Sequence, residues 1–206
     1  MIGGGGHASV LIDICNQQNR EVIAIFSPDD IDTRKIFNGI QHFKNDEDIL
    51  HFSAEEIELI NGIGSVKDVN LRKNIADKFM QLGYQFATVV ANSAIVSEEV
   101  SFERGVQILP GAIINSGVSI GQHAIINSGA LIEHDCVIDE FVHVCPRAVI
   151  CGHVKIENCC IIGPSSVIGI GLKIGENSAV GAGASVVRSI DKSKKVLPVK
   201  TIINSR

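Results

Sequence analysis

Large aliphatic residues recur at every sixth position through the second half of the chain. The series begins at Val96 and ends at Val186, without a change of register. Its members are Val96, Phe102, Ile108, Ile114, Ile120, Ile126, Ile132, Ile138, Val144, Ile150, Ile156, Ile162, Ile168, Ile174, Val180 and Val186. A mostly small residue, such as Ala112 or Ala124, lies two positions before each following member. An α-helix needs a period near 3.6 and an ordinary strand a period of 2, so neither explains this repeat.

Short strands separated by regular corners do explain a repeat of six. In a parallel β-helix, each side of a triangular coil contributes one large and one small inward residue, and successive coils stack these into a continuous core. The pattern predicts a β-helix of roughly five coils within residues 89–190. Such a prism has flat faces, which favour assembly into a trimer. Its ends need covers, and the candidates are the N-terminal residues and the tail 191–206.

Residues 1–88 show a different pattern, in which strands alternate with helices. A glycine turn opens a first helix, "EVIAIF" reads as a buried strand, and "YQFATVV" reads as a strand leading into the repeats. A second helix has Asp68 as its N-cap and Gly83 as its C-terminal stop. Its expected apolar stripe consists of Val69, Leu71, Ile75, Phe79 and Leu82. Together these elements predict a small α/β domain with a parallel sheet.

The glycines near the N-terminus fit the pattern G-x-G-x-x-A, formed by Gly3, Gly5 and Ala8. Such a turn lets backbone N–H groups and a helix N-terminus approach a phosphate. Asp29 and Asp30 follow the next strand, where dinucleotide folds contact a ribose or base. The alternative is a flexible turn followed by a solvated acidic loop. Only two residues precede the glycines, so the first strand is either very short or shortened at the start.

Composition excludes several classes of protein. Lys and Arg number 18 against 23 Asp and Glu, and the net charge of -5 argues against nucleic acid or anionic membrane as a partner. No apolar run approaches the roughly 20 residues of a membrane-spanning helix, and no secretion signal is evident, so we expect a soluble cytoplasmic protein. The six cysteines form no C-x-x-C pair and are expected to be reduced and buried, with Cys145, near His143, as an alternative nucleophile.

The stretch "ALIEHDCVIDEFVHV" places ionisable groups inside the aliphatic repeat. His134 lies between Glu133 and Asp135, and His143 follows nine positions later. A neutral imidazole that is hydrogen-bonded to a carboxylate can accept a proton near pH 7. From the residues alone, His134 is either such a general base or a surface histidine at a coil corner.

The order of these features resembles a known family. The glycine turn with "GGH", the α/β unit, hexapeptides such as "IGQHAI" and "VGAGAS", and "IEHDCVI" are similar to the bacterial hexapeptide-repeat sugar acetyltransferases. Members use acetyl-CoA to N-acetylate nucleotide-linked 4-amino-4,6-dideoxyhexoses, and sialic-acid O-acetyltransferases are relatives. The resemblance implies a Rossmann-like N-terminal domain that holds the nucleotide sugar. It also implies a left-handed β-helix that forms a homotrimer, with acetyl-CoA and the active sites between subunits.

The resemblance also implies roles for individual residues. His134 corresponds to the general base, and Asp135 to the carboxylate that raises its basicity. The expected acetyl-CoA contacts are His143, Gly163, Pro164 and Ala182. The expected substrate contacts are Gly5, Gly6, His7, Asp29, Asp30, Gly64 and Asn127. The reaction also needs an oxyanion donor, and the candidates are Asn127 or a backbone N–H. His123 and His153 are expected to be solvated, and no metal is expected. The ending "VLPVKTI" departs from the family's Gly-x-Pro-Ala.

Three other functions remain open. Acetylation of a sugar hydroxyl, as in the sialic-acid enzymes, would use the same base and donor. A non-catalytic nucleotide-sugar-binding trimer would need no base at all. A metal-dependent hydratase on the same β-helix needs an H-x-x-x-x-H pair. The spacings of 11, 9 and 10 between His123, His134, His143 and His153 disfavour that hydratase.

Overall fold

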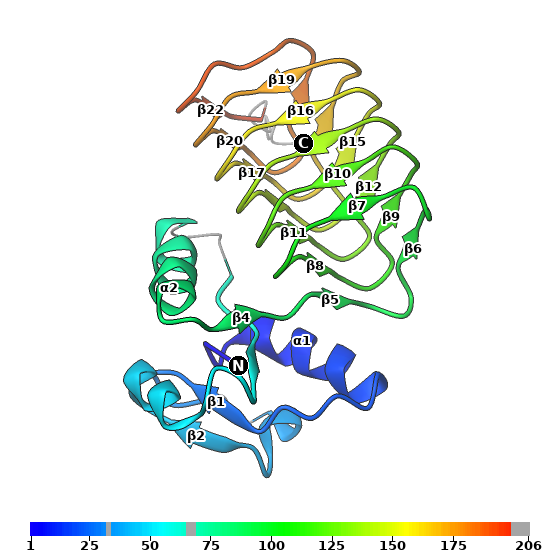
Figure 1. Ribbon diagram of the computed structural model, residues 1–206. Coiled ribbons are helices and arrows are strands. Elements are labelled where there is room, and N and C mark those ends of the chain that lie inside the picture. Colours follow the sequence, from blue (N-terminus) through cyan, green and yellow to red (C-terminus); the bar gives the residue numbers. More distant parts are fainter. Residues whose placement is uncertain (32–33, 65–68, 199–206) are drawn as a thin grey trace, which may run out of the picture.

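The structure of the protein is a computed structural model that describes residues 1–31, 34–64 and 69–198. An α/β domain lies at one end and a long stack of coils rises from it (Figure 1). No helix among the described residues has the length and apolar character required to cross a lipid bilayer. The expected N-cap Asp68 lies outside the described residues.

The N-terminal domain contains parallel strands that are joined through a bridge at Ile2. The strands are β1 (Ala24–Phe26), β2 (Gln41–Phe43), β3 (Glu58–Leu59) and β4 (Gln85–Phe86). β1 pairs with β2, β3 pairs with β4, and Ile2 bridges Phe26 on one side and Asn61 on the other. The resulting order, β2-β1-Ile2-β3-β4, corresponds to five of the six strands in the Rossmann order 3-2-1-4-5-6. The first strand is therefore present, and it consists of the buried residues Met1 and Ile2.

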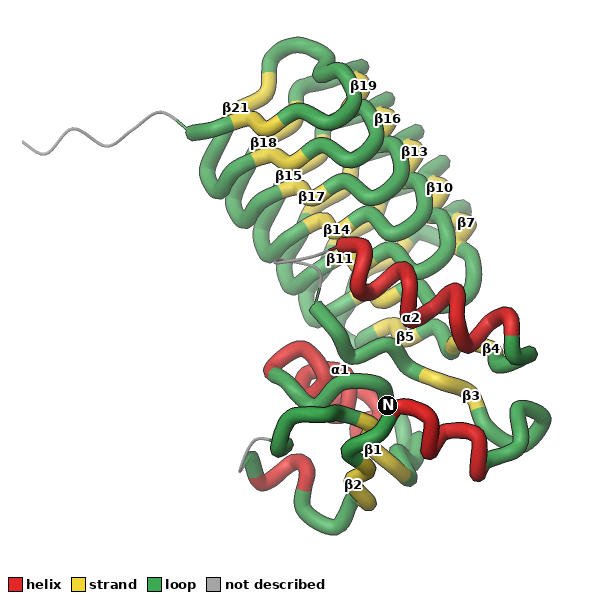
Figure 2. The backbone as a smooth tube through the Cα atoms, turned by 90° about the vertical axis from the view of Figure 1, so that its left-hand side faces the viewer, coloured by secondary structure: helices red, strands yellow, loops and turns green. Residues whose placement is uncertain are grey.

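The described residues of the domain form two α-helices, α1 (Gly6–Gln17) and α2 (Val69–Gln81), and two 3₁₀ helices, η1 (Lys35–Phe37) and η2 (Asp46–His51). The expected apolar stripe of α2 is wrong in part, because Leu71 and Leu82 are 48% and 50% exposed. The buried face consists of Arg72, Ala76 and Phe79. α2 packs beside the first coils (Figure 2), and the Arg72 guanidinium donates to the carbonyl oxygens of Asn61 and Ile63. These hydrogen bonds to the backbone allow the positively charged Arg72 side chain to lie on the buried face of α2.

Two-residue strands make up the β-helix. They are β5 (Val89–Val90), β6 (Ile95–Val96), β7 (Ser101–Phe102), β8 (Gln107–Ile108), β9 (Ile113–Ile114), β10 (Ser119–Ile120), β11 (Ile125–Ile126), β12 (Leu131–Ile132), β13 (Val137–Ile138), β14 (His143–Val144), β15 (Val149–Ile150), β16 (Lys155–Ile156), β17 (Ile161–Ile162), β18 (Val167–Ile168), β19 (Lys173–Ile174), β20 (Ala179–Val180), β21 (Ser185–Val186) and β22 (Lys195–Val196).

These strands form three parallel sheets. The β12 sheet has the order β21-β18-β15-β12-β9-β6, the β13 sheet has β19-β16-β13-β10-β7, and the β14 sheet has β22-β20-β17-β14-β11-β8-β5. Ile126 pairs with Val144, so one coil takes 18 residues. The predicted large and small positions fill the core from Val106 onward, whereas Phe102 in the first coil is 41% exposed.

The corners also repeat every six residues, and at each corner one residue adopts a left-handed backbone conformation. Gly117, Asp135, His153 and Gly171 have φ values of +73°, +58°, +58° and +67° and follow one another along a single edge. Non-glycine residues adopt this conformation at some energetic cost, which the regular ladder hydrogen bonds around them offset.

The two parts of the chain share a core. β5 pairs with β8, and Leu109 and Ile125 from the β14 sheet pack in one cluster with Leu11 and Ile12 of α1. The N-terminal domain therefore covers the lower end of the β14 sheet and the first coils.

Candidate active site

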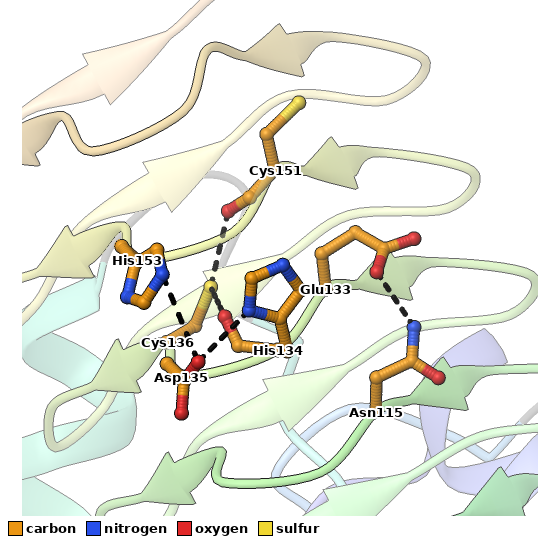
Figure 3. A network of polar contacts seen from close by, with 7 residues as sticks. All are labelled: Asn115, Glu133, His134, Asp135, Cys136, Cys151 and His153. Carbon is orange, nitrogen blue, oxygen red and sulfur yellow. Dashed lines mark hydrogen bonds and ion pairs between the residues drawn. The ribbon is translucent and has the colours of Figure 1, made fainter.

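His134 and Asp135 form a hydrogen-bonded pair at the corner between β12 and β13. The His134 Nδ1 and Asp135 Oδ2 atoms are 2.8 Å apart (Figure 3). Both side chains are about half exposed. The hydrogen bond from His134 holds the pKa of the Asp135 carboxyl below its usual value. An ionised Asp135 accepts a hydrogen bond from Nδ1–H, so the lone pair of the neutral ring lies on Nε2.

Glycines in the neighbouring coils make room for this pair. A Cβ atom at Gly152, one coil beyond His134, would lie 2.8 Å from its Cε1 and Nε2 atoms. A Cβ atom at Gly117, one coil before Asp135, would lie 2.5 Å from its Oδ1 atom. The ring and the carboxylate thus lie over positions where any side chain would displace them.

Sequence reasoning missed the neighbour of this pair. His153 is exposed, as expected, yet its Nε2 atom lies 3.8 Å from Oδ2 of Asp135. Its ring meets that of His134 edge to face, with centroids 5.0 Å apart. The spacing of 18 residues between Asp135 and His153 is the signal that could have found this contact, since residues one coil apart are stacked.

His143 and Asn127 lie together on another side of the prism. His143 belongs to β14 and is buried, and its Nε2 atom lies 2.9 Å from Nδ2 of Asn127. Burial, with smaller effects of His7 and Arg72, lowers the pKa of His143 to about 3. This imidazole is therefore neutral at physiological pH, and the Asn127 amide donates to its Nε2 atom.

The other expected acetyl-CoA contacts form one edge, where the β14 sheet turns into the β12 sheet. Pro164 and Ala182 occupy equivalent positions in successive coils, and the Gly183 amide donates to the Pro164 carbonyl. A Cβ atom at Gly163 would collide with the carbonyl oxygen of Val180. Asn127 begins the same corner two coils earlier, so Asn127, Gly163, Pro164 and Ala182 all line this edge.

One chain does not bring the two groups together. His134 and Asp135 lie at the edge where the β12 sheet meets the β13 sheet, whereas Gly163 and Pro164 lie at the edge where it meets the β14 sheet. The full width of the β12 sheet therefore separates them.

The N-terminal candidates gather at the carboxyl ends of the parallel strands. Gly5 is the N-cap of α1, and Gly6 opens the helix. His7 Nε2 lies 2.7 Å from Oε1 of Gln107, and a Cβ atom at Gly64 would lie 3.8 Å from the His7 Cβ. Burial lowers the pKa of His7 to about 4, with a smaller contribution from Arg72.

The two candidate aspartates differ in their surroundings. Asp29 and Asp30 are both exposed after β1. Asp30 forms an ion pair with Lys44 at 2.6 Å, and this hydrogen bond lowers its pKa. Open α/β sheets bind ligands outside the carboxyl ends of the strands, at the point where the strand order reverses. Here that point lies between Ile2 and β3, and Gly5, Gly6, His7 and Gly64 follow the ends of these elements in the chain.

The structure contradicts the expectation for His123 and the alternative role of Cys145. His123 is not solvated as expected: it is 1% exposed and stacks on Phe141, with ring centroids 4.9 Å apart. The N-terminal domain causes this, because Phe86 packs edge to face against the same ring. Cys145 is buried, and burial raises the pKa of its thiol to about 11, so it is not a thiolate nucleophile at neutral pH.

Comparison with known proteins shows where the chain belongs. The family described as PglD N-terminal domain matches residues 1–79. PerB from Caulobacter crescentus, solved with CoA and GDP-perosamine, is 30% identical, with 94% of this chain and 90% of that chain covered and a TM-score of 0.85. The acetyltransferase domain of PglB from Neisseria gonorrhoeae, in complex with acetyl coenzyme A, is 23% identical, with 98% and 97% covered and a TM-score of 0.86.

WeeI from Acinetobacter baumannii is also similar, with 23% identity, 94% of this chain and 93% of that chain covered, and a TM-score of 0.84. The fold prediction is confirmed: a Rossmann-like α/β domain precedes a left-handed β-helix of hexapeptide repeats, the fold of an acyltransferase. The chain belongs to the hexapeptide-repeat sugar N-acetyltransferases, the family that includes PerB.

Proposed function

We propose that the protein transfers an acetyl group from acetyl-CoA to the 4-amino group of a nucleotide-linked 4-amino-4,6-dideoxyhexose, with His134 as the general base. The observation that carries this proposal is the 2.8 Å hydrogen bond between His134 Nδ1 and Asp135. It leaves Nε2 as the basic atom of a half-exposed ring. Similarity to PerB, whose structure holds CoA and GDP-perosamine, supports this substrate class.

The chemistry needs one proton acceptor and no covalent enzyme intermediate. The amine nitrogen attacks the thioester carbonyl carbon, and a tetrahedral adduct forms. His134 Nε2 accepts the proton that the nitrogen loses, the C–S bond breaks, and CoA leaves as a thiolate that takes up a proton. Asp135 stabilises the imidazolium that forms on His134. General base catalysis of this kind contributes about 10²- to 10⁴-fold to the rate.

The acceptor's nucleotide is expected at the carboxyl edge of the N-terminal sheet. There Gly5 and Gly6 present backbone N–H groups at the start of the 12-residue helix α1. Gly64 lies beside His7 at this edge, and Asp29 and Asp30 lie in the loop after β1. The backbone N–H groups of Gly5 and Gly6 support contacts to the diphosphate. The carboxylates of Asp29 and Asp30 support contacts to the nucleoside.

The donor is expected along the edge formed by Asn127, Gly163, Pro164 and Ala182, with His143 beside it. Because this edge and the His134 edge lie on opposite sides of the β12 sheet, a homotrimer would join one chain's His134 to a neighbour's donor edge. The outward residues of that sheet support packing between chains. They are aliphatic in five consecutive strands: Ile95, Ile113, Leu131, Val149 and Val167. The equivalent residues of the β13 sheet include Lys155 and Lys173.

A substrate panel tests the proposal. UDP-, dTDP- and GDP-linked 4-amino sugars are incubated with acetyl-CoA, and free CoA thiol is followed together with product mass. Matched sugars that carry a 4-hydroxyl in place of the amine serve as controls. We expect thiol release only with an amino sugar, and a loss of at least about a hundredfold in His134→Ala. Turnover of the hydroxyl sugars alone, or unchanged turnover in His134→Ala, would contradict the proposal.

A further inference from the structure

Three potential metal ligands meet at the surface corner that holds His134. One ligand atom each from His134, Asp135 and His153 lies within 4.8 Å of the other two. His134 Nδ1 and Asp135 Oδ2 are 2.8 Å apart, and His153 Nε2 and Asp135 Oδ2 are 3.8 Å apart. The three side chains are 48%, 53% and 60% exposed, so a cation from solvent can reach them.

Two of the three separations between ligand atoms are close to those of a tetrahedral zinc site. Ligand atoms at about 2.0–2.2 Å from a tetrahedral Zn²⁺ lie about 3.3–3.5 Å from one another. The observed separations of 2.8 and 3.8 Å fall on either side of that value. Shifts of about half an ångström in exposed side chains would make both separations fit. The Gly152 and Gly117 positions leave the space in which the His134 ring and the Asp135 carboxylate can make that adjustment.

We propose that His134, Asp135 and His153 bind one transition-metal cation of the Zn²⁺ type, and that this binding switches off acetyl transfer. Two imidazoles and one carboxylate select Zn²⁺, Cu²⁺ or Ni²⁺ over Mg²⁺ and Ca²⁺, which prefer oxygen ligands. Three protein ligands leave a fourth position for water. The site is inhibitory and is distinct from a resident cofactor site, because it uses the nitrogen through which Asp135 orients His134.

The inhibitory effect follows from the tautomer of His134, and this step rests on the proposed function. Without metal, Nδ1 carries a proton and donates a hydrogen bond to Asp135, and the lone pair of the neutral ring lies on Nε2. A metal on Nδ1 needs the lone pair at Nδ1 itself, so the proton of the neutral ring must be on Nε2. A ring in this state cannot accept a proton from the amine at Nε2. The same cation also occupies the carboxylate that would stabilise the imidazolium.

Binding is tested without any reference to activity. Calorimetric titration of the metal-free protein with ZnCl₂ is compared with the same titration of His153→Asn and His153→Gly. Asn tolerates the left-handed backbone at this position, and Gly occupies the equivalent positions 117 and 171. His51→Asn, which removes an exposed histidine from η2, is the matched control. We expect one Zn²⁺ per chain, at least about tenfold weaker binding in both His153 variants, and no change in His51→Asn.

A spectroscopic titration identifies the ligands. Co²⁺ at this site is expected to give the visible bands of a tetrahedral nitrogen and oxygen site without a sulfur-to-cobalt charge-transfer band. A charge-transfer band, or Zn²⁺ affinity in the His153 variants equal to that of the unsubstituted protein, would overturn the proposed site.

The inhibitory step is tested on the active enzyme. We expect Zn²⁺ to abolish acetyl transfer reversibly, with recovery on addition of EDTA. His153→Asn should retain metal-free activity within about twofold and should need at least about tenfold more Zn²⁺ for the same inhibition. Full activity of the Zn²⁺-loaded enzyme would overturn the inhibitory step. A protein that binds Zn²⁺ as expected but acetylates no amino sugar would support the metal site and contradict the proposed function.

Discussion

Asp135 lies one coil before His153 and accepts a hydrogen bond from His134, its neighbour in sequence, at 2.8 Å. The hydrogen bond fixes the His134 tautomer in which Nε2 is basic. Without an acceptor at Nδ1, the ring would lose both the preference for that tautomer and the charge that stabilises its protonated form. In the proposed mechanism, the corner therefore needs the Asp135 carboxylate as well as the His134 imidazole.

Replacement of Asp135 by asparagine tests this dependence. Asn suits the left-handed backbone at position 135, so the fold should be unchanged. Its amide can donate to Nδ1 and so favour the opposite tautomer. We expect kcat/KM for the amino sugar to fall at least about tenfold while the melting temperature stays the same. Unchanged kcat/KM with an intact fold would show that Asp135 does not orient His134.

The absence of a side chain at position 152 is expected to be required for activity. In Gly152→Ala, the new Cβ would lie 2.8 Å from Nε2 of His134, so the ring must move. Displacement of a catalytic group by about 1 Å can cost about a hundredfold in rate. We expect a loss of that size in kcat, measured with saturating substrates.

A double-mutant cycle provides the control for this substitution. In the His134→Ala background, Gly152→Ala should cause no further loss, because the ring that it displaces is absent. Equal losses in both backgrounds would mean that the alanine acts through the fold of the coil instead.

The outward face of the β12 sheet predicts which substitutions dissociate the proposed trimer. Leu131→Lys places a charge within its aliphatic row, where burial between chains would be unfavourable. Val137→Lys is the matched control, since Val137 points outward from the β13 sheet and is exposed. We expect sedimentation equilibrium to give a trimer for the unsubstituted protein and Val137→Lys, and a monomer with no activity for Leu131→Lys. If Leu131→Lys still formed a trimer, the interface between chains would not be the outward face of the β12 sheet.

Buried neutral histidines should make the protein less stable in acid. Burial lowers the pKa of His143 to about 3 and that of His123 to about 4, from a model-peptide value of 6.5. Below pH 6.5 the unfolded chain therefore binds more protons than the folded one, and the free energy of unfolding falls until the pH reaches the folded-state pKa. At pH 5 each histidine should cost about 2 kcal/mol relative to pH 7.5, measured by urea unfolding.

His123→Phe tests this account of acid sensitivity. Phenylalanine preserves the stacking on Phe141 and has no proton to gain. We expect the variant to lose less stability than the unsubstituted protein between pH 7.5 and pH 5, by about 2 kcal/mol. The same pH dependence in both proteins would show that His123 does not contribute to it.

The β-helix can be predicted directly from the sequence because equivalent core residues of successive coils stack on one another. Each inward position, such as Ile126 or Val144, contacts its equivalents one coil away, so a period of six defines the packing. The same rule extends to the corner. Adding 18 to 135 gives His153, and adding 18 to 134 gives Gly152, although neither contact was predicted from the sequence.

The junction between the two parts could not be predicted in the same way. The burial of His123 depends on Phe86 from the N-terminal domain. The inner face of α2 carries Arg72, whose guanidinium also donates to the carbonyl oxygen of His123, 51 residues away. Likewise, the partner of His7 is Gln107, 100 residues away. Contacts between an aperiodic domain and one end of a prism leave no regular signal in the chain.

The coil length has a consequence for changes in chain length. Since Ile126 pairs with Val144, a deletion of 18 residues would remove one coil and keep every later residue on its original face. A deletion of six residues would preserve the hydrophobic spacing but would move every later residue to the next side of the β-helix. Between His134 and Gly163, such a deletion would leave the core packed but would move Gly163, Pro164 and Ala182 to a different edge.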